Sequence, residues 1–149
     1  MTLVEATPRE PSGLEQLRRA LEGPGHVGIG ATLGFRIVTL EEGRVVFAGT
    51  PGRNVYNPIG SVHGGYAATL LDSACGCAVH SRLAAGQGYT TLELKVAYHK
   101  AMTERTGEVL AEGRVVALGR RAAFAEATLK DKEGRLLASA TSTLLVFAR

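Results

Sequence analysis

Apolar and polar residues along the chain follow two different periods, one helical and one typical of strands. Near the start, leucines recur at helical spacing from Leu14 to Leu21. Gly23-Pro24-Gly25 ends that pattern, which predicts a short amphipathic helix. Two short runs, Phe35 to Leu40 and Arg44 to Ala48, are separated by Glu41-Glu42-Gly43 and predict a β-hairpin.

The longest apolar stretch runs from Gly64 to about Leu83 and contains no proline. A helix of ~20 residues spans ~30 Å, which is long for a chain of this size. On a helical wheel, one side is apolar and a second stripe holds small or polar residues. That stripe consists of Thr69, Asp72, Ser73, Gly76 and His80. Both sides are therefore expected to be buried, against different partners.

After Gly88 the pattern changes to that of strands. Four antiparallel strands joined by tight turns are expected, at 90–99, 107–118, 121–130 and 136–147. In the first of them, apolar residues such as Leu92 and Leu94 alternate with a polar face that includes Thr91. Because helix and sheet are segregated along the chain, the fold class is α+β. One long helix is covered only if the sheet curves around it.

Length and composition fit one globular domain spanning residues 1–149. Within it, about 1–30 form a leader and short helix and 31–147 form the core. Hydrophobic residues make up 45% of the chain and charged residues 21%, which is not the composition of a disordered protein. The net charge of +3 is spread along the sequence. That distribution argues against nucleic acid as a partner and suits a small anionic ligand.

Cys75 and Cys77 point in different directions on the predicted helix, so they neither form a disulfide nor share a metal ion. The histidines show no metal-ligand spacing, and no metal is expected. Residues 1–10 contain acidic side chains and no apolar segment, so no secretory signal is expected. No stretch reaches the ~20 apolar residues of a membrane span. These features favour a cytoplasmic protein without a membrane partner.

The residues that can carry chemistry are concentrated just before and within the long helix. His63, Gly64 and Gly65 open it. The first N–H groups of a helix lack internal partners and the helix dipole favours negative charge there, so an oxyanion can bind at this turn. Asp72, two turns later, supplies a base or a nucleophile.

The spacing of Gly64 and Asp72 limits how they can cooperate. Eight residues of helix separate them by ~12 Å, whereas a nucleophile must come within ~3 to 3.5 Å of the carbon it attacks. One chain therefore cannot supply both halves of one site. If both residues act, two helices must run antiparallel across a two-fold axis, so that Asp72 of one chain approaches Gly64 of another.

The motif and the order of elements resemble the hotdog fold. Within that fold they are most similar to the acyl-CoA thioesterases of the PaaI-like (phenylacetate-pathway) and 4-hydroxybenzoyl-CoA thioesterase type. The resemblance covers roughly residues 30–147. It rests on Asn57, on His63-Gly64-Gly65, on Asp72, on the small-residue helix and on residues 119–127.

The resemblance implies a thioesterase that converts a small or aromatic acyl-CoA, such as phenylacetyl- or hydroxyphenylacetyl-CoA, to the free acid and CoA. Coenzyme A enters as part of the substrate, and no further cofactor is implied. The minimal unit would be a homodimer with two composite sites, and pairs of dimers would form a homotetramer.

By this resemblance, the Gly64 N–H polarises the thioester carbonyl and the partner subunit's Asp72 attacks it or activates water. Asn57 would position the thioester or the water, and Gly65 would line the bound substrate. His63 either fixes the turn through a backbone hydrogen bond or transfers a proton, and we favour the first.

Thr91 occupies a position where some relatives carry a Ser or Thr near the substrate, although Thr is also common on a polar strand face. Arg120 and Arg121 sit at a predicted turn, where guanidinium groups match phosphate geometry and either bind CoA phosphates or remain solvated. Gly76 departs from one branch of the family, which carries a Thr there to orient water.

Two alternatives remain open. The first is a non-catalytic acyl-CoA-binding or regulatory hotdog protein, which the intact acid Asp72 argues against. The second is a hotdog hydratase or dehydratase, which usually pairs a His with a carboxylate. The glycine turn followed by an acid fits hydrolysis better.

Overall fold

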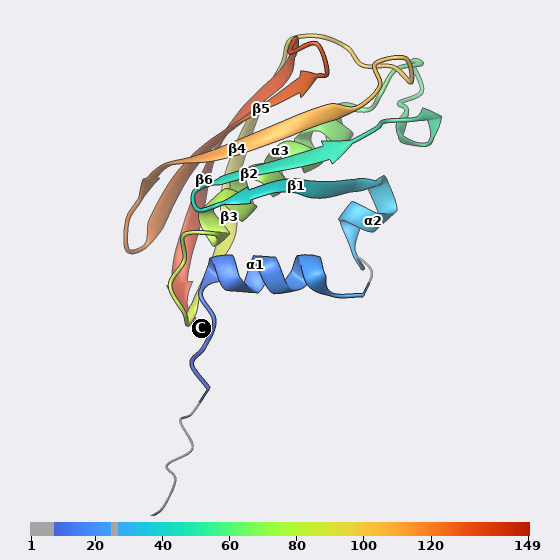
Figure 1. The fold of residues 1–149 in the computed structure, drawn as a ribbon. Helices are drawn as coiled ribbons and strands as arrows, with labels where there is room; N and C mark the ends of the chain where they lie inside the picture. The colour runs from blue at the N-terminus through green and yellow to red at the C-terminus, as the bar shows by residue number, and fades with distance from the viewer. Residues whose placement is uncertain (1–7, 25–26) are drawn as a thin grey trace, which may run out of the picture.

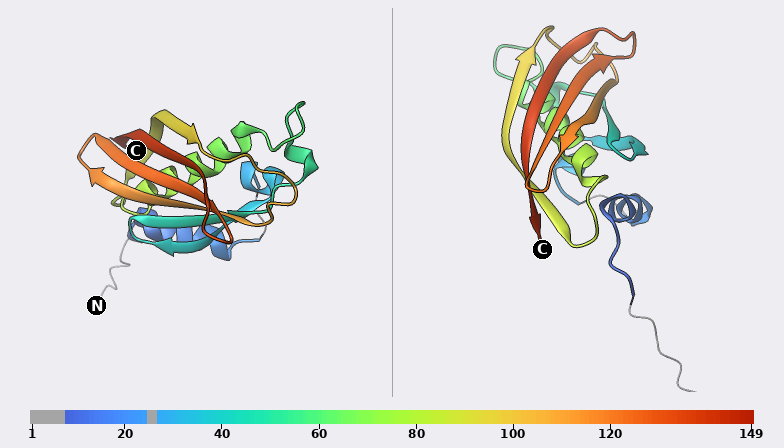
Figure 2. Two further views of the ribbon diagram at one scale, coloured as in Figure 1. Left: turned by 90° about the horizontal axis from the view of Figure 1, so that it is seen from above. Right: turned by 90° about the vertical axis from the view of Figure 1, so that its left-hand side faces the viewer.

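A six-stranded antiparallel sheet curves around the long helix α3 (Gly64–His80), as Figures 1 and 2 show. The computed structural model describes residues 8–24 and 27–149. The strand order is β1-β2-β4-β5-β6-β3. The strands are β1 (Phe35–Glu41), β2 (Arg44–Gly49), β3 (Gln87–Tyr98), β4 (Val109–Leu118), β5 (Ala122–Asp131) and β6 (Leu136–Ala148). The predicted α+β class and hotdog architecture are confirmed.

The connection between β3 and β4 differs from the tight turn expected there. β3 pairs with β6 instead of β4, and it forms one edge of the sheet while β1 forms the other. The intervening segment is anchored at the start of α3, because Met102 is buried and its carbonyl accepts a hydrogen bond of 2.9 Å from Val62 N–H. This anchor carries the chain across the sheet, so no β3–β4 hairpin forms.

A bulge in β3 reverses the predicted face of Thr91. The pairing register with β6 shifts between Thr91 and Glu93, which leaves Leu92 as an extra residue with 59% of its surface exposed. Thr91 consequently lies on the same face as Leu94, toward α3. A bulge of this kind re-aims a side chain without ending the strand.

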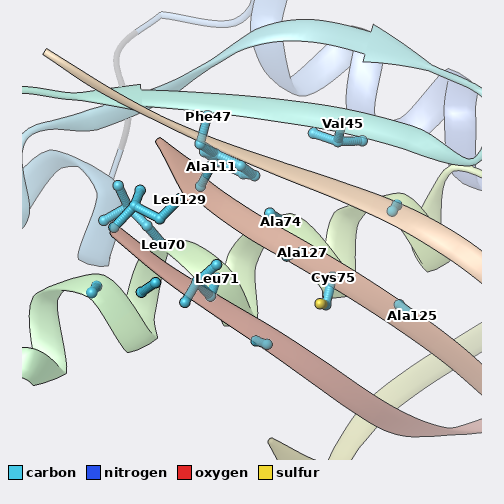
Figure 3. Close-up of a cluster of buried hydrophobic side chains, with 14 of the residues drawn as sticks. Val45, Phe47, Leu70, Leu71, Ala74, Cys75, Ala111, Ala125, Ala127 and Leu129 are labelled. Carbon is cyan, nitrogen blue, oxygen red and sulfur yellow. The ribbon is translucent and has the colours of Figure 1, made fainter. Parts of the chain in front are cut away.

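The core lies between α3 and the concave face of the sheet. Figure 3 shows Leu70, Leu71, Ala74 and Cys75 of α3 facing residues of β2, β4 and β5. The helix approaches β4 very closely, since a Cβ on Gly113 would lie 2.2 Å from the Ala74 carbonyl oxygen.

Helix α3 ends at His80, three residues before the predicted end. The Ser81 hydroxyl donates to the Ala78 carbonyl at 2.7 Å and accepts from Gly43 N–H at 2.8 Å. These bonds tie the end of the helix to the β1–β2 turn.

Two short helices precede the sheet. The predicted helix α1 (Gly13–Glu22) begins with a capping box formed by Ser12 and Glu15. A second helix, α2 (Ile29–Leu33), was not predicted, because glycines flank it and no side chain caps it. A 3-10 turn, η1 (Arg53–Val55), precedes the motif.

In the part of the chain that the structure describes, no helix combines the length and apolar character needed to cross a membrane. The expectation that residues 1–10 contain no secretory signal lies largely outside the described residues.

Candidate active site

The turn that opens α3 leaves one backbone donor free. His63 is the N-cap residue, and its Nδ1 accepts a hydrogen bond of 2.8 Å from Gly65 N–H. Tyr66 N–H donates to the His63 carbonyl at 3.0 Å. Among the described residues, no group accepts a hydrogen bond from Gly64 N–H. The first turn of α3 therefore presents this single donor, at the positive end of the helix dipole.

The same contacts assign His63 and Gly65 to the turn itself. The imidazole of His63 fixes the backbone, as the structural interpretation of the sequence expects. A Cβ on Gly65 would lie 2.8 Å from His63 Nδ1, so only glycine fits under the ring. Gly65 N–H already donates to His63 within the chain. The contact of Gly65 with substrate remains a prediction.

Asn57 organises the loop that leads into the turn. Its Oδ1 accepts hydrogen bonds from the backbone of Ile59 at 3.1 Å and of Ser61 at 3.2 Å. Its Nδ2 donates to Ser61 Oγ at 3.1 Å. In this structure Asn57 shapes the loop, and its predicted role toward thioester or water remains a prediction.

Tyr98, the last residue of β3, holds the first turn of α3. Its hydroxyl donates to the Gly64 carbonyl at 2.8 Å. A Cβ on Gly64 would lie 3.0 Å from the end of the Tyr98 ring. The signal for this contact in the sequence is weak, because a tyrosine at the end of an alternating strand is usually a packing residue.

Asp72 lies in the middle of α3 and is half-buried. Thr91 Oγ1 donates a hydrogen bond of 3.1 Å to Asp72 Oδ1. Within the described residues, Oδ2 has no hydrogen-bond donor. Thr91 thus fixes the carboxylate and leaves one oxygen free to accept a proton, which places the two predicted site residues together.

The helix runs without interruption from Gly64 to His80. The separation of ~12 Å between Gly64 and Asp72 therefore holds in the folded chain. The two candidate groups of one chain therefore lie apart, one at the start of α3 and one in its middle.

A pocket of about 390 Å³ opens beside Asp72. Its polar end is formed by α3 and β3, with Asp72, Ser73, Gly76, Cys77, Tyr89 and Thr91. Its other walls come from α1, α2, the segment before α2, β1 and β2. Their lining residues are Leu17, Ala20, Leu21, Val27, Ile29, Gly30, Ala31, Phe35, Arg36, Ile37 and Phe47.

The chain itself covers part of the small-residue stripe on α3. Gly76 is buried under Tyr89, whose ring would lie 3.2 Å from a Cβ at that position. His80 Nε2 is 3.1 Å from Gln16 Oε1 of α1. Gly76 and His80 therefore pack against parts of their own chain. Thr69 and Ser73 remain half-buried.

The buried thiol and phenol in the pocket, those of Cys77 and Tyr89, are neutral at physiological pH. Burial raises the pKa of the Cys77 thiol to about 12, with a smaller contribution from Asp72. Burial, followed by Cys77 and Asp72, also raises the pKa of the Tyr89 phenol. A thiol in this state is a poor nucleophile. Asp72 thus remains the candidate acid–base group of the pocket.

Arg120 and Arg121 lie at the β4–β5 turn, far from the Gly64 of their own chain. Val146 N–H donates to the Arg121 carbonyl, whereas the start of α3 lies beside Leu137. Nine residues of β6 separate these two points by about 30 Å. The arginines are closer to Asp72, because Thr91 and Ala123 both pair with Leu144.

The chain belongs to the thioesterase superfamily, whose sequence model matches residues 59–138. The match includes the Gly64 turn, all of α3 with Asp72, and β3 to β5. No curated protein sequence matches the chain significantly.

Solved structures give the same assignment. A thioesterase family protein from Silicibacter pomeroyi is 30% identical over 93% of this chain and 100% of its own, with a TM-score of 0.79. The protein smu.793 from Streptococcus mutans, bound to acetyl CoA, is 29% identical over 77% of this chain and 90% of its own, with a TM-score of 0.70. A hypothetical thioesterase from Streptococcus pneumoniae, solved with coenzyme A, is 28% identical over the same shares, with a TM-score of 0.70. We conclude that this chain is a thioester hydrolase.

The hydrogen bond from Gly65 N–H to His63 predicts how His63 variants behave. His63→Ala should lower the free energy of unfolding by ~1 kcal/mol, as expected for a lost N-cap, and should reduce turnover of a thioester. Asn caps helices well, so His63→Asn should restore most of both. Denaturant unfolding and a thiol-release assay measure the two effects. Equal loss of turnover in both variants, with the stability of His63→Asn intact, would instead assign proton transfer to the imidazole.

Proposed function

We propose that this protein hydrolyses acyl-CoA thioesters to the free carboxylic acid and CoA. The observation that carries the proposal is the free Gly64 N–H at the start of α3, combined with the free oxygen of Asp72 beside an apolar pocket. The two relatives solved with acetyl CoA and coenzyme A support CoA as the thiol half of the substrate.

In the proposed reaction, the thioester carbonyl oxygen accepts a hydrogen bond from Gly64 N–H. When a nucleophile adds to the carbonyl carbon, negative charge develops on that oxygen, beside a fixed donor and the positive end of a helix dipole. The donor belongs to the backbone, so it acts without a side chain. Tyr98 keeps the turn in place through the Gly64 carbonyl.

Asp72 supplies the second half of the reaction. As a general base it takes a proton from water on Oδ2 while the water oxygen bonds to the carbonyl carbon. As a nucleophile it forms a mixed anhydride that water then cleaves. In both routes the C–S bond breaks, the sulfur leaves as the CoA thiol, and one water is consumed. Thr91 holds Oδ1 in place in either case.

A two-subunit site is part of the proposal, and β3 supports it. Tyr98 anchors the Gly64 turn and Thr91 anchors Asp72, so one edge strand carries both anchors. Within the described residues no strand pairs with the outer edge of β3, and such an edge is a template for a second copy. If two copies of β3 pair antiparallel about a two-fold axis near Leu94 and Lys95, Thr91 lies opposite the partner subunit's Tyr98. The partner subunit's Gly64 then approaches Asp72.

The proposed holder of the CoA phosphates is the arginine pair at the β4–β5 turn. Arg121 precedes Ala123 by two residues, or ~7 Å of extended chain. Ala123 and Thr91 both pair with Leu144, and Thr91 bonds Asp72. Both arginines are exposed. The protomer that supplies Asp72 would therefore also bind the phosphates, while its partner supplies the Gly64 N–H.

The proposed substrates are small or aromatic acyl-CoAs of the kind handled by PaaI-like thioesterases, such as phenylacetyl-CoA. Pairing of dimers into homotetramers and a cytoplasmic location, both expected from the sequence, belong to the same proposal.

Replacing the carboxylate tests the proposed chemistry. Asp72→Asn should lower kcat for acyl-CoA hydrolysis by ~10² to 10⁴-fold, the usual contribution of general acid–base catalysis, with the oligomeric state unchanged. The measurement is CoA thiol release from phenylacetyl-, hydroxybenzoyl-, acetyl- and octanoyl-CoA. Unchanged turnover in Asp72→Asn would contradict the proposal. Tight binding of acyl-CoA by the native protein without any thiol release would point to the non-catalytic alternative.

A matched pair of variants isolates the Gly64 N–H. Gly64→Pro removes the donor, and proline is well accepted at the first position of a helix. The preceding residue, His63, has the extended backbone (φ −60°, ψ 134°) that proline requires. Gly64→Ala adds the same Cβ against Tyr98 but keeps the N–H.

We expect kcat of Gly64→Pro to lie ~10² to 10³-fold below that of Gly64→Ala, as for a lost oxyanion donor. Both variants should unfold at similar temperatures. Equal kcat values in the two variants would exclude the N–H as the oxyanion donor.

A further inference from the structure

We propose that helices α1 and α2 form the specificity-determining wall of the acyl pocket and select a compact, apolar, uncharged acyl group. This inference rests on the proposed function, because it assigns the acyl half of the same substrate. The supporting observation is that the pocket beside Asp72 extends away from α3 to both N-terminal helices.

Helix α1 is held firmly enough to serve as a wall. Gly13 N–H donates to the Leu83 carbonyl at 3.0 Å, and Gln16 contacts His80 of α3. The fit is tight, since a Cβ on Gly13 would lie 1.8 Å from the His80 carbonyl oxygen. Leu17 is buried with 8% of its surface exposed. The pocket is therefore bounded by a docked helix.

Beyond Asp72, the far walls are apolar. Leu17, Leu21 and Ile29 come from the helices, and Phe35, Ile37 and Phe47 come from β1 and β2. Cys77 and Tyr89 remain uncharged, as their raised pKa values require. The one cation in the lining, Arg36, is exposed. A carboxylate at the end of an acyl group would thus lose its hydration without gaining a buried partner, which is costly.

The size of the pocket limits the acyl group. A volume of about 390 Å³ is near the lower end of the ~300–1,000 Å³ found for small-molecule sites. Asp72 occupies the polar end, where the reacting carbonyl belongs. The remaining apolar space suits a short chain or a single ring.

The two helices lie outside residues 59–138, the part of the chain that matches the superfamily. The polar half of the pocket thus lies within the matched core, whereas α1, α2, β1 and β2, which line its other half, precede that core.

Substitutions on the exposed side of these helices test the assignment. Ala20 of α1 and Ala31 of α2 line the pocket and are exposed, so Ala20→Leu and Ala31→Leu fill space without disturbing the core. Arg18→Leu is the matched control, because Arg18 is exposed on α1 but does not line the pocket. Leu21→Ala enlarges the pocket.

The readout is kcat/KM for straight-chain acyl-CoAs from acetyl- to dodecanoyl-CoA, together with phenylacetyl- and succinyl-CoA. Ala20→Leu should lower the ratio of kcat/KM for the longest accepted chain to that for acetyl-CoA by ~10-fold or more, the effect of about one excess methylene. Ala31→Leu should act in the same direction. Leu21→Ala should move the optimum to longer chains, and Arg18→Leu should match the native profile.

If all four variants show the chain-length profile of the native protein, this inference is overturned while the proposed function remains intact. A native preference for succinyl-CoA over butanoyl-CoA would have the same consequence. Absence of thiol release from every acyl-CoA by the native protein would instead refute the proposed function.

Discussion

The constraint on which the proposed site depends is the rigid distance between Gly64 and Asp72. Both residues lie on one uninterrupted helix, and eight residues of helix separate them by ~12 Å. A reacting carbonyl cannot reach both in one chain. The need for a second copy of the chain follows from this distance, and the free edge of β3 and the placement of the arginine pair are compatible with it.

The sheet supports this arrangement by tying each half-site to the same strand. Thr91 bonds Asp72 and Tyr98 bonds Gly64, so β3 fixes the orientation of both groups relative to its own edge. The bulge at Leu92 is what turns Thr91 toward the helix. Small residues let α3 lie close to the sheet, as Gly113 against Ala74 shows, and the N-terminal helices then enclose the space that remains beside Asp72.

Much of this could be predicted from the sequence because the patterns are local. The small-residue helix after His63-Gly64-Gly65 and the alternating strands determine the α+β hotdog architecture, and the helical spacing of Gly64 and Asp72 holds unchanged. The pairing of β3 with β6 could not be predicted, because it depends on Met102 anchoring a loop at the start of α3. The predicted face of Thr91 was wrong, because a one-residue bulge has no clear signal in the sequence. The contacts of Tyr98 with Gly64 and of Tyr89 with Gly76 join distant segments, and no local pattern reveals them.

The central claim is that each active site combines Gly64 of one subunit with Asp72 of another. The most direct test mixes two inactive variants, Gly64→Pro and Asp72→Asn, by co-expression or by reversible dissociation. A mixed dimer contains one site with both defects and one site with neither, so random mixing should restore about a quarter of the native activity. That recovery is the predicted result. If mixed dimers form and remain inactive, both groups act within one chain and the account is contradicted.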